Sequence, residues 1–210
     1  KTEWIKSNYR LLRYNNKRNN IILKMKVGFL LGTFDPIHMG HLYMIASALN
    51  DNLVDEVVVV PTMQNVWKDR EATEFQHRCF MTQLAIDEID NCTISSIDYY
   101  TPEPHYSYQT LQLLKEYYPN EELYLIVGAD IVDDIANWKE GEWILENFKL
   151  IAVNRANSSF KAKVDGYISC TFDVSSTMIR YLVKDKKQIY PLVPKAISQY
   201  IHRFNLYKDE

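Results

Sequence analysis

Residues 57–60 are four consecutive valines, preceded by Glu56 and followed by Pro61. β-Branched side chains favour extended backbone, so the run predicts a strand. A strand with one face in water alternates apolar and polar side chains, whereas a strand buried on both faces is continuously apolar. The valine run therefore predicts a central strand of a parallel sheet that is covered by helices on both sides.

Strand and helix patterns alternate along the rest of the chain. The predicted strands are residues 26–31, 55–61, 92–100, 122–130, 149–155 and 165–172, of which 92–100 has the weakest pattern; the predicted helices are residues 40–51, 74–89, 106–119, 141–148, 175–185 and 194–206. Repeated alternation of this kind is typical of α/β proteins. We therefore expect a doubly wound parallel sheet, with no internal repeat.

The length and the charge distribution predict one folded domain with a basic extension. The chain has 210 residues, 47% of them apolar, which is enough for one sizeable core. We expect this domain over residues 25–210 and an N-terminal basic extension over residues 1–24. Residues 1–26 contain eight Lys or Arg and a single acidic residue, Glu3, while the remaining residues carry 16 basic and 26 acidic side chains. A solvated tail is the favoured interpretation, and contact with nucleic acid stays open.

Several protein classes are disfavoured by the sequence. The chain has three cysteines, Cys79, Cys92 and Cys170, which are too few and too widely spaced to predict a disulfide framework or a zinc site. Lys24 and Lys26 interrupt the apolar segment around them, and no other apolar run approaches the roughly 20 residues of a membrane helix. We expect a cytoplasmic protein with no membrane contact, either monomeric or homo-oligomeric.

The segment GTFDPIHMGH, residues 32–41, stands where the first strand of the domain turns into a helix. Ligands of such sheets bind at the carboxyl ends of the strands, beside the amino ends of the following helices. Gly32 permits a tight turn and Gly40 leaves room at the helix start. The first N–H groups of a helix attract anions, and His38 and His41 lie close enough along the helix to bind one phosphate.

The histidine pair has two other interpretations. A histidine in a turn is often structural or merely exposed. A pair at this spacing also binds metals, but no third imidazole or thiol ligand is evident nearby. Phosphate binding is therefore the favoured interpretation. His77 and His202 lie on predicted helices and are assigned structural or solvent-facing positions.

The segment GTFDPIHMGH resembles the HxGH motif of a nucleotidyltransferase superfamily, and VSSTMIR, residues 174–180, resembles the second motif of that superfamily. Residues 104–123 and 123–138 are similar to the corresponding stretches of the bacterial nicotinate-mononucleotide adenylyltransferases. The likeness covers about residues 25–207. It implies a Rossmann-like nucleotidyltransferase fold for the domain at residues 25–210.

The resemblance also implies an activity. Members of this family join ATP to nicotinate mononucleotide, which gives nicotinate adenine dinucleotide, a precursor of NAD, and releases pyrophosphate. Mg²⁺ is expected to be carried by the ATP phosphates, with no metal ligands from the protein. ATP and nicotinate mononucleotide are thus the expected partners.

The family motifs assign residues to each substrate. His38, His41 and Arg180 are the expected catalytic residues, with His41 close to the α-phosphate and Arg180 at the β- and γ-phosphates. The expected ATP-binding residues are Gly32, Thr33, Phe34, His38, Gly40, His41, Ser175, Ser176, Thr177 and Arg180. Apart from the family, the Ser-Ser-Thr run also reads as an ordinary helix N-cap.

The expected acceptor-binding residues are Lys68, Tyr106, Ser107, Gly128, Asp130, Trp138 and Arg155. The resemblance implies that Asp130 accepts ribose hydroxyls, that Trp138 stacks on the pyridine ring, and that the Tyr106–Ser107 backbone meets the nicotinate carboxylate. Two stretches depart from the family pattern. Trp67 stands where the family has a histidine, and HYSYQT, residues 105–110, replaces a Ser-Tyr-Thr pattern.

Two alternatives remain at this point. The first alternative is a sister transferase that acts on nicotinamide mononucleotide, phosphopantetheine or a cytidylyl acceptor. The second is a non-catalytic nucleotide-binding regulator that uses its basic extension. Trp138 favours a pyridine ring over pantetheine. Binding to nucleic acid that weakens steeply with salt would favour the regulator.

Overall fold

The structure is a computed structural model that describes residues 24–63, 71–155, 160–170 and 173–208, with Arg155 described by its backbone alone. Most of the basic extension and Lys68 lie outside the described residues. The strands are β1 Lys26–Gly32, β2 Glu56–Pro61, β3 Cys92–Ile94, β4 Glu122–Gly128, β5 Lys149–Arg155 and β6 Gly166–Cys170. The helices are α2 Met39–Asn50, α3 Phe75–Ile86, α4 Ser107–Tyr117, α5 Gly141–Asn147, α6 Ser176–Lys184 and α7 Lys195–Arg203, with 3₁₀ turns η1 Ile97–Tyr100 and η2 Val132–Asn137.

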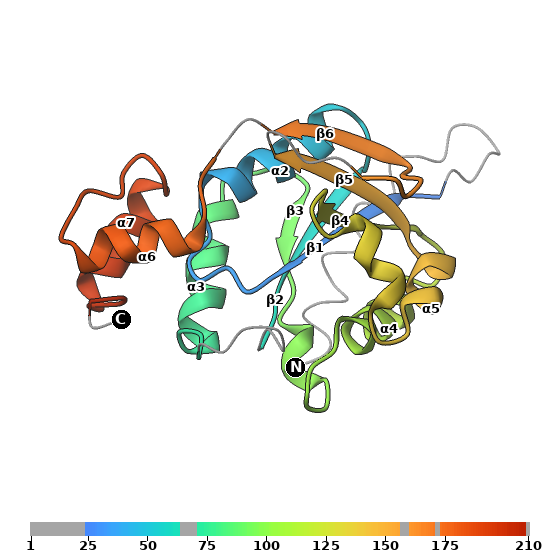
Figure 1. Cartoon of the computed structure of the whole chain (residues 1–210), viewed down its shortest axis with the longest axis horizontal. Helices are drawn as coiled ribbons and strands as arrows, with labels where there is room; N and C mark the ends of the chain where they lie inside the picture. The colour runs from blue at the N-terminus through green and yellow to red at the C-terminus, as the bar shows by residue number, and fades with distance from the viewer. Residues whose placement is uncertain (1–23, 64–70, 156–159, 171–172, 209–210) are drawn as a thin grey trace.

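The six strands form one parallel sheet in the order β3-β2-β1-β4-β5-β6 (Figure 1). The chain runs outward from β1 to β3, returns to place β4 beside β1, and then runs outward on the other side to β6. The strand order therefore reverses between β1 and β4. In sheets of this type the ligand lies outside the carboxyl ends of the strands at this reversal. The predicted doubly wound α/β fold is confirmed.

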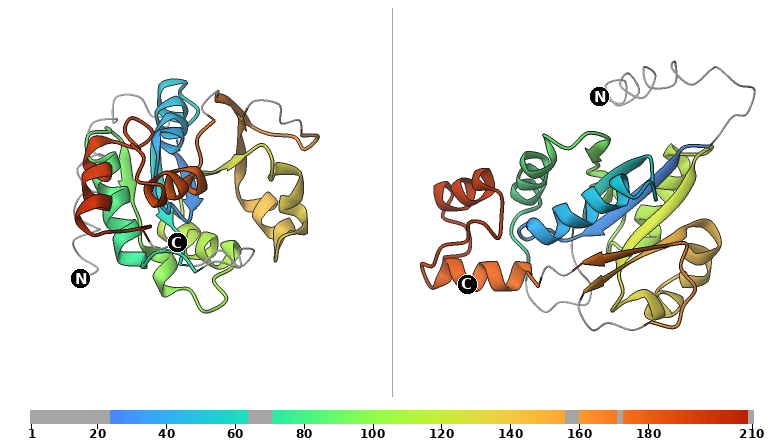
Figure 2. Two further views of the ribbon diagram at one scale, coloured as in Figure 1. Left: turned by 60° about the vertical axis from the view of Figure 1, so that its left-hand side comes forward. Right: turned by 90° about the horizontal axis from the view of Figure 1, so that it is seen from above.

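Both faces of the sheet are covered, as the valine run predicts. Val57 and Val59 belong to one buried cluster, which includes the inner faces of α2, α3, α6 and α7. Val58 and Val60 belong to a second cluster, with α4, α5 and the two 3₁₀ turns. In Figure 1, helices α3, α6 and α7 lie to the left of the sheet and α4 and α5 lie to its right, and Figure 2 shows the same arrangement from two other directions. None of the described helices is long and apolar enough to cross a membrane.

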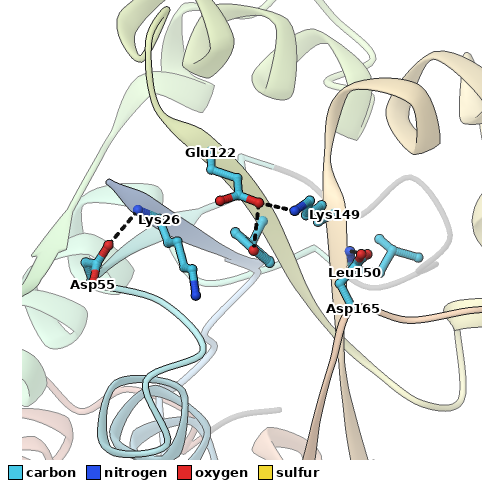
Figure 3. Close-up of polar contacts among 7 residues, drawn as sticks. Lys26, Asp55, Glu122, Lys149, Leu150 and Asp165 are labelled. Carbon is cyan, nitrogen blue, oxygen red and sulfur yellow. Dashed lines mark hydrogen bonds and ion pairs between the residues drawn. The ribbon is translucent and has the colours of Figure 1, made fainter. Parts of the chain in front are cut away.

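Polar contacts join the amino ends of the strands, which lie opposite the carboxyl ends where the site is predicted (Figure 3). The Lys26 N–H donates to the Asp55 carboxylate at 2.7 Å, and the Leu150 N–H donates to Asp165 at 3.0 Å. Glu122 accepts a hydrogen bond from Lys149 on the neighbouring strand. These contacts align the amino ends of neighbouring strands.

One predicted element is partly wrong. Residues 92–100 were expected to form a single strand, but β3 ends at Ile94 and the chain then turns into η1. The turn brings Asp98 inward, where it is fully buried. Its carboxylate accepts hydrogen bonds from the Met63 N–H and the Thr110 hydroxyl. These contacts favour the turn over a longer strand.

Candidate active site

The loop after β1 turns sharply at Phe34. Phe34 has a φ of 47°, in the left-handed region that non-glycine residues rarely adopt. This conformation folds its ring back over Gly32, where a Cβ atom would lie 3.0 Å from the ring. Phe34 is 2% exposed. The loop is thus held in a strained conformation, a feature that clusters at functional sites.

The two motif histidines lie against each other at the start of α2. Their ring centroids are 3.7 Å apart with 20° between the planes, and the Phe34 ring meets the His41 ring edge-on at 4.9 Å. His38 is buried, at 2% exposed, whereas His41 is half-buried. The His38 ring rests on Gly40, where a Cβ atom would be only 3.1 Å from it. Gly40 therefore makes the stacked arrangement possible.

The hydrogen bonding of His41 indicates which nitrogen carries its proton. Its Nδ1 accepts a hydrogen bond from the His38 backbone N–H at 3.2 Å. A nitrogen that accepts cannot carry the proton of a neutral imidazole, so the proton lies on Nε2. His41 is accordingly arranged as a hydrogen-bond donor through Nε2.

The structure brings the second motif to the first. The Arg180 guanidinium donates through Nη1 to the Asp35 carbonyl at 2.8 Å, across 145 positions of sequence. The Ser176 hydroxyl donates to the Pro36 carbonyl at 2.9 Å, across 140 positions. Ser175 caps α6, because its hydroxyl accepts from the Met178 N–H at 3.2 Å, and Thr177 is exposed. The N-cap interpretation of the Ser-Ser-Thr run is confirmed for Ser175.

The expected ribose-binding turn lies at the carboxyl end of β4, beside β1. Asp130 is exposed, and its carboxylate folds back against Gly128, where a Cβ atom would lie 2.3 Å from its Oδ1. No side chain larger than hydrogen fits at Gly128 without moving Asp130. The turn is thus open to solvent next to the strand reversal, where the sheet topology places a ligand.

The other expected acceptor residues lie on η2 and α4. Trp138 ends η2 and is half-buried, with part of its ring packed against the second buried cluster. At the start of α4, the Tyr106 N–H donates to the Gln109 side chain at 2.7 Å. The Tyr106 N–H is therefore already occupied, and a carboxylate bound at this helix start would accept a hydrogen bond from the Ser107 N–H.

Arg78 is a buried cation that the sequence did not assign to the site. It lies on α3 and is 1% exposed. Its guanidinium donates to four backbone carbonyls, those of Thr33, Thr62, Met63 and Thr73, at 2.6 to 2.9 Å. Burial lowers the pKa of Arg78, and the Asp35 carboxylate is the main opposing influence. Arg78 thus ties the loops that follow β1 and β2 to each other.

Asp98 completes the support of the loop after β2. Its carboxylate accepts from the Met63 N–H at 2.6 Å, while Arg78 donates to the Met63 carbonyl. Met63 is thus held on both sides, five positions before Lys68. Asp98 lies in a segment predicted to be a strand, so nothing in its local sequence marked it.

Comparisons with known proteins agree with this geometry. The profile of the cytidylyltransferase-like family matches residues 29–182, most of the chain. The nicotinate-nucleotide adenylyltransferase of Bacillus subtilis is 32% identical over 187 residues, covering 88% of this chain and 99% of that protein. The chain belongs to this family of nucleotidyltransferases. A protein of Flavobacterium johnsoniae named probable nicotinate-nucleotide adenylyltransferase is 34% identical over 192 residues, covering 88% of this chain and all of that protein.

The fold of this nucleotidyltransferase is also found in a solved structure. Plasmodium falciparum nicotinic acid mononucleotide adenylyltransferase, complexed with NaAD, aligns with a TM-score of 0.72 at 23% identity. The alignment covers 89% of this chain and 98% of the other. At this identity the likeness supports the fold, and the family assignment stands on the sequence matches.

Proposed function

We propose that the chain transfers the adenylyl group of ATP to nicotinate mononucleotide, forming nicotinate adenine dinucleotide and pyrophosphate. The observation that carries the proposal is the junction of the two motifs at the strand reversal. Arg180 and Ser176 bond to the loop that leads into His38 and His41. The relatives from Bacillus subtilis and Flavobacterium johnsoniae, matched along nearly their full lengths, bear the name of this activity.

The reaction needs positioning more than proton transfer. An acceptor phosphate oxygen attacks the α-phosphorus of ATP, a new P–O bond forms, and the bond to the oxygen bridging the β-phosphate breaks as pyrophosphate leaves. A phosphate monoester has a second pKa of about 6, so the nucleophile is already ionised at pH 7. The protein must align two anions and stabilise the charge of the transition state.

The described residues suit that task. In our proposal His41 donates from Nε2 to the α-phosphate, since its Nδ1 is occupied by the His38 N–H. His38 contacts the phosphates beside it and keeps the His41 ring in place by stacking. Arg180, held on the Asp35 carbonyl, meets the β- and γ-phosphates. The starts of α2 and α6 add N–H and hydroxyl donors, Ser175, Ser176 and Thr177 among them.

The acceptor lies on the β4 side of the reversal in this proposal. Asp130 accepts ribose hydroxyls, and Trp138 stacks its exposed part on the pyridine ring. The Tyr106–Ser107 corner at the start of α4 meets the carboxylate of nicotinate. Lys68 and Arg155 supply positive charge toward the acceptor phosphate and the rim of the site.

Mg²⁺ is proposed to accompany ATP. Among the described residues, no group of three or more His, Cys, Asp or Glu side chains is arranged to hold a metal ion. Phosphate oxygens and water are ligands that Mg²⁺ prefers. Bound to the phosphates, the ion would neutralise part of their charge, while the residues above hold the substrates in line.

The experiment that tests the proposal is formation of the dinucleotide from ATP and nicotinate mononucleotide by the wild type, by His41→Ala and by His202→Ala. Losing a donor to a developing charge typically costs about 100- to 1,000-fold in turnover. We expect that loss for His41→Ala. His202 is exposed on α7, away from the motifs, so His202→Ala should match the wild type. A His41→Ala protein with wild-type turnover would refute the proposed role.

A further inference from the structure

The carboxyl-terminal turn reaches the nucleotide loop through one buried hydrogen bond. The Tyr207 hydroxyl donates to Asp35 Oδ1 at 2.8 Å, across 172 positions of sequence. Tyr207 is 4% exposed and Asp35 is 2% exposed. Burial, followed by the adjacent Asp35 carboxylate, raises the pKa of Tyr207, so the hydroxyl keeps its proton and remains a donor. The hydrogen bond is thus shielded from water by burial, and the Tyr207 hydroxyl remains protonated at neutral pH.

Asp35 is the point at which three distant segments meet the loop. Its Oδ1 accepts from Tyr207, its Oδ2 accepts from the Thr73 N–H at 3.3 Å, and its main-chain carbonyl accepts from Arg180 at 2.8 Å. Removing a hydrogen-bond donor from a buried carboxylate strongly destabilises the folded protein, because the charge is left without a partner. The position of Asp35 therefore depends on Tyr207, and the position of Arg180 depends in turn on Asp35.

The loop needs such support because its backbone is strained. Phe34, directly before Asp35, has a positive φ of 47°. A residue in this region keeps its conformation only when its surroundings fix it. The Phe34 ring contacts His41. A displacement of Asp35 would consequently displace His41, through the Phe34 ring, and Arg180, through the hydrogen bond to the Asp35 carbonyl.

We propose that Tyr207 and Asp35 form a positioning pair that sets the geometry of His41 and Arg180 for adenylyl transfer. The proposal rests on the function proposed above and adds two residues to it. Neither side chain touches the reacting atoms in this account. Tyr207 acts from the carboxyl-terminal turn, outside both motifs, so the turn becomes part of the active-site support.

The test compares Tyr207→Phe with Tyr200→Phe. Each substitution removes one tyrosine hydroxyl. The Tyr207 hydroxyl bonds to Asp35 and also interacts with the Thr73 side chain, whereas the Tyr200 hydroxyl, on α7, lies 2.8 Å from Nδ1 of His77 on α3. We expect Tyr207→Phe to lower kcat about tenfold, because small misplacements of positioned groups are costly. KM for nicotinate mononucleotide should stay within about twofold of the wild-type value. Tyr200→Phe should leave kcat unchanged.

A second readout separates positioning from loss of stability and does not depend on turnover. The ¹H–¹⁵N spectrum of the imidazole rings reports the Nδ1 and Nε2 environments of His41. These signals should move in Tyr207→Phe and stay in Tyr200→Phe, at a temperature where both variants are fully folded. Unmoved His41 signals, or a kcat matching that of Tyr200→Phe, would overturn the positioning pair.

A double-mutant comparison adds a check on the partner. In the background of Asp35→Ala, which removes the acceptor of the Tyr207 hydroxyl, the effect of Tyr207→Phe on kcat should largely disappear, because the two residues act as one unit. Effects that multiply independently would contradict the pair. If the wild type itself makes no dinucleotide, the proposed function fails, and the imidazole spectra still decide whether Tyr207 positions His41.

Discussion

At the scale of single residues, the geometry of the site depends on the space left by Gly40. A Cβ atom at residue 40 would lie 3.1 Å from the His38 ring and 3.1 Å from Val174, which precedes α6. His41 stacks on that ring. The room that Gly40 was expected to leave at the helix start is therefore the space that the His38 ring needs.

Gly40→Ala should therefore reduce turnover more than stability. Alanine is intrinsically better than glycine in a helix by about 1 kcal/mol, so helix propensity opposes any loss. The added methyl group would push the His38 ring and, through it, His41. We expect a drop in kcat of about tenfold with a melting temperature near that of the wild type. A Gly40→Ala protein with wild-type kcat would show that the ring stack is unimportant.

At the scale of elements, the corner between η2 and α5 fixes Trp138. The Gly141 N–H donates to the Trp138 carbonyl at 2.9 Å. A Cβ atom at Gly141 would lie 2.1 Å from the Ile135 carbonyl oxygen and 2.8 Å from that of Ala136. Both obstacles are backbone atoms, so they cannot move aside by a rotamer change.

Gly141→Ala is expected to destabilise the protein by on the order of 3 kcal/mol, because the backbone of the corner must shift. It should also raise KM for the acceptor through Trp138. Gly166→Ala is the matched control, since its Cβ atom would meet only side-chain atoms of Ile151 and Leu53 at 3.1 Å or more. Urea unfolding measures both variants. Equal losses of stability would contradict this account of the corner.

The elements also show how far the sequence could predict the site. Local patterns gave the sheet, both motifs and the helices that carry them, because hydrophobic periodicity and turn residues act over a few positions. The contacts of Arg78, Asp98 and Tyr207 join segments that are far apart in the chain, such as Tyr207 and Asp35. No local pattern specifies such partners. The same reason explains the error at residues 92–100, where Asp98 is drawn inward by Met63 and Thr110.

At the scale of the whole molecule, two partly buried thiols, Cys79 and Cys92, make the free energy of unfolding depend on pH in the alkaline range. Burial raises the pKa of Cys79 to about 11, and burial together with Glu56 raises that of Cys92 to about 12. The unfolded thiols ionise at lower pH, so above about pH 9 the unfolded state binds fewer protons than the native state. The free energy of unfolding then falls as pH rises.

The expected result is a steeper fall for the wild type than for Cys79→Ala/Cys92→Ala between pH 9 and pH 10.5. Each thiol can add at most about 1.4 kcal/mol per pH unit, and partial exposure reduces that value. Urea unfolding at several pH values measures the slopes. Parallel slopes in the two proteins would mean that the thiols do not titrate as their burial indicates.

The strand order of the whole molecule agrees with the proposed meeting place of the two substrates. Strand order reverses between β1 and β4, so the loop carrying His41 and the turn carrying Asp130 open at the same edge of the sheet. ATP on the β1 side and a mononucleotide on the β4 side would place their phosphates together. The fold thereby supplies the alignment that adenylyl transfer requires.

The most direct test of this account is pyrophosphate release with ATP and Mg²⁺, comparing nicotinate mononucleotide with nicotinamide mononucleotide at equal concentration. We predict release at least tenfold faster with the nicotinate form, which corresponds to roughly 1.4 kcal/mol of discrimination. Equal or reversed rates would contradict the assignment of the Tyr106–Ser107 corner to the carboxylate. Absence of release with either acceptor would contradict the proposed function itself.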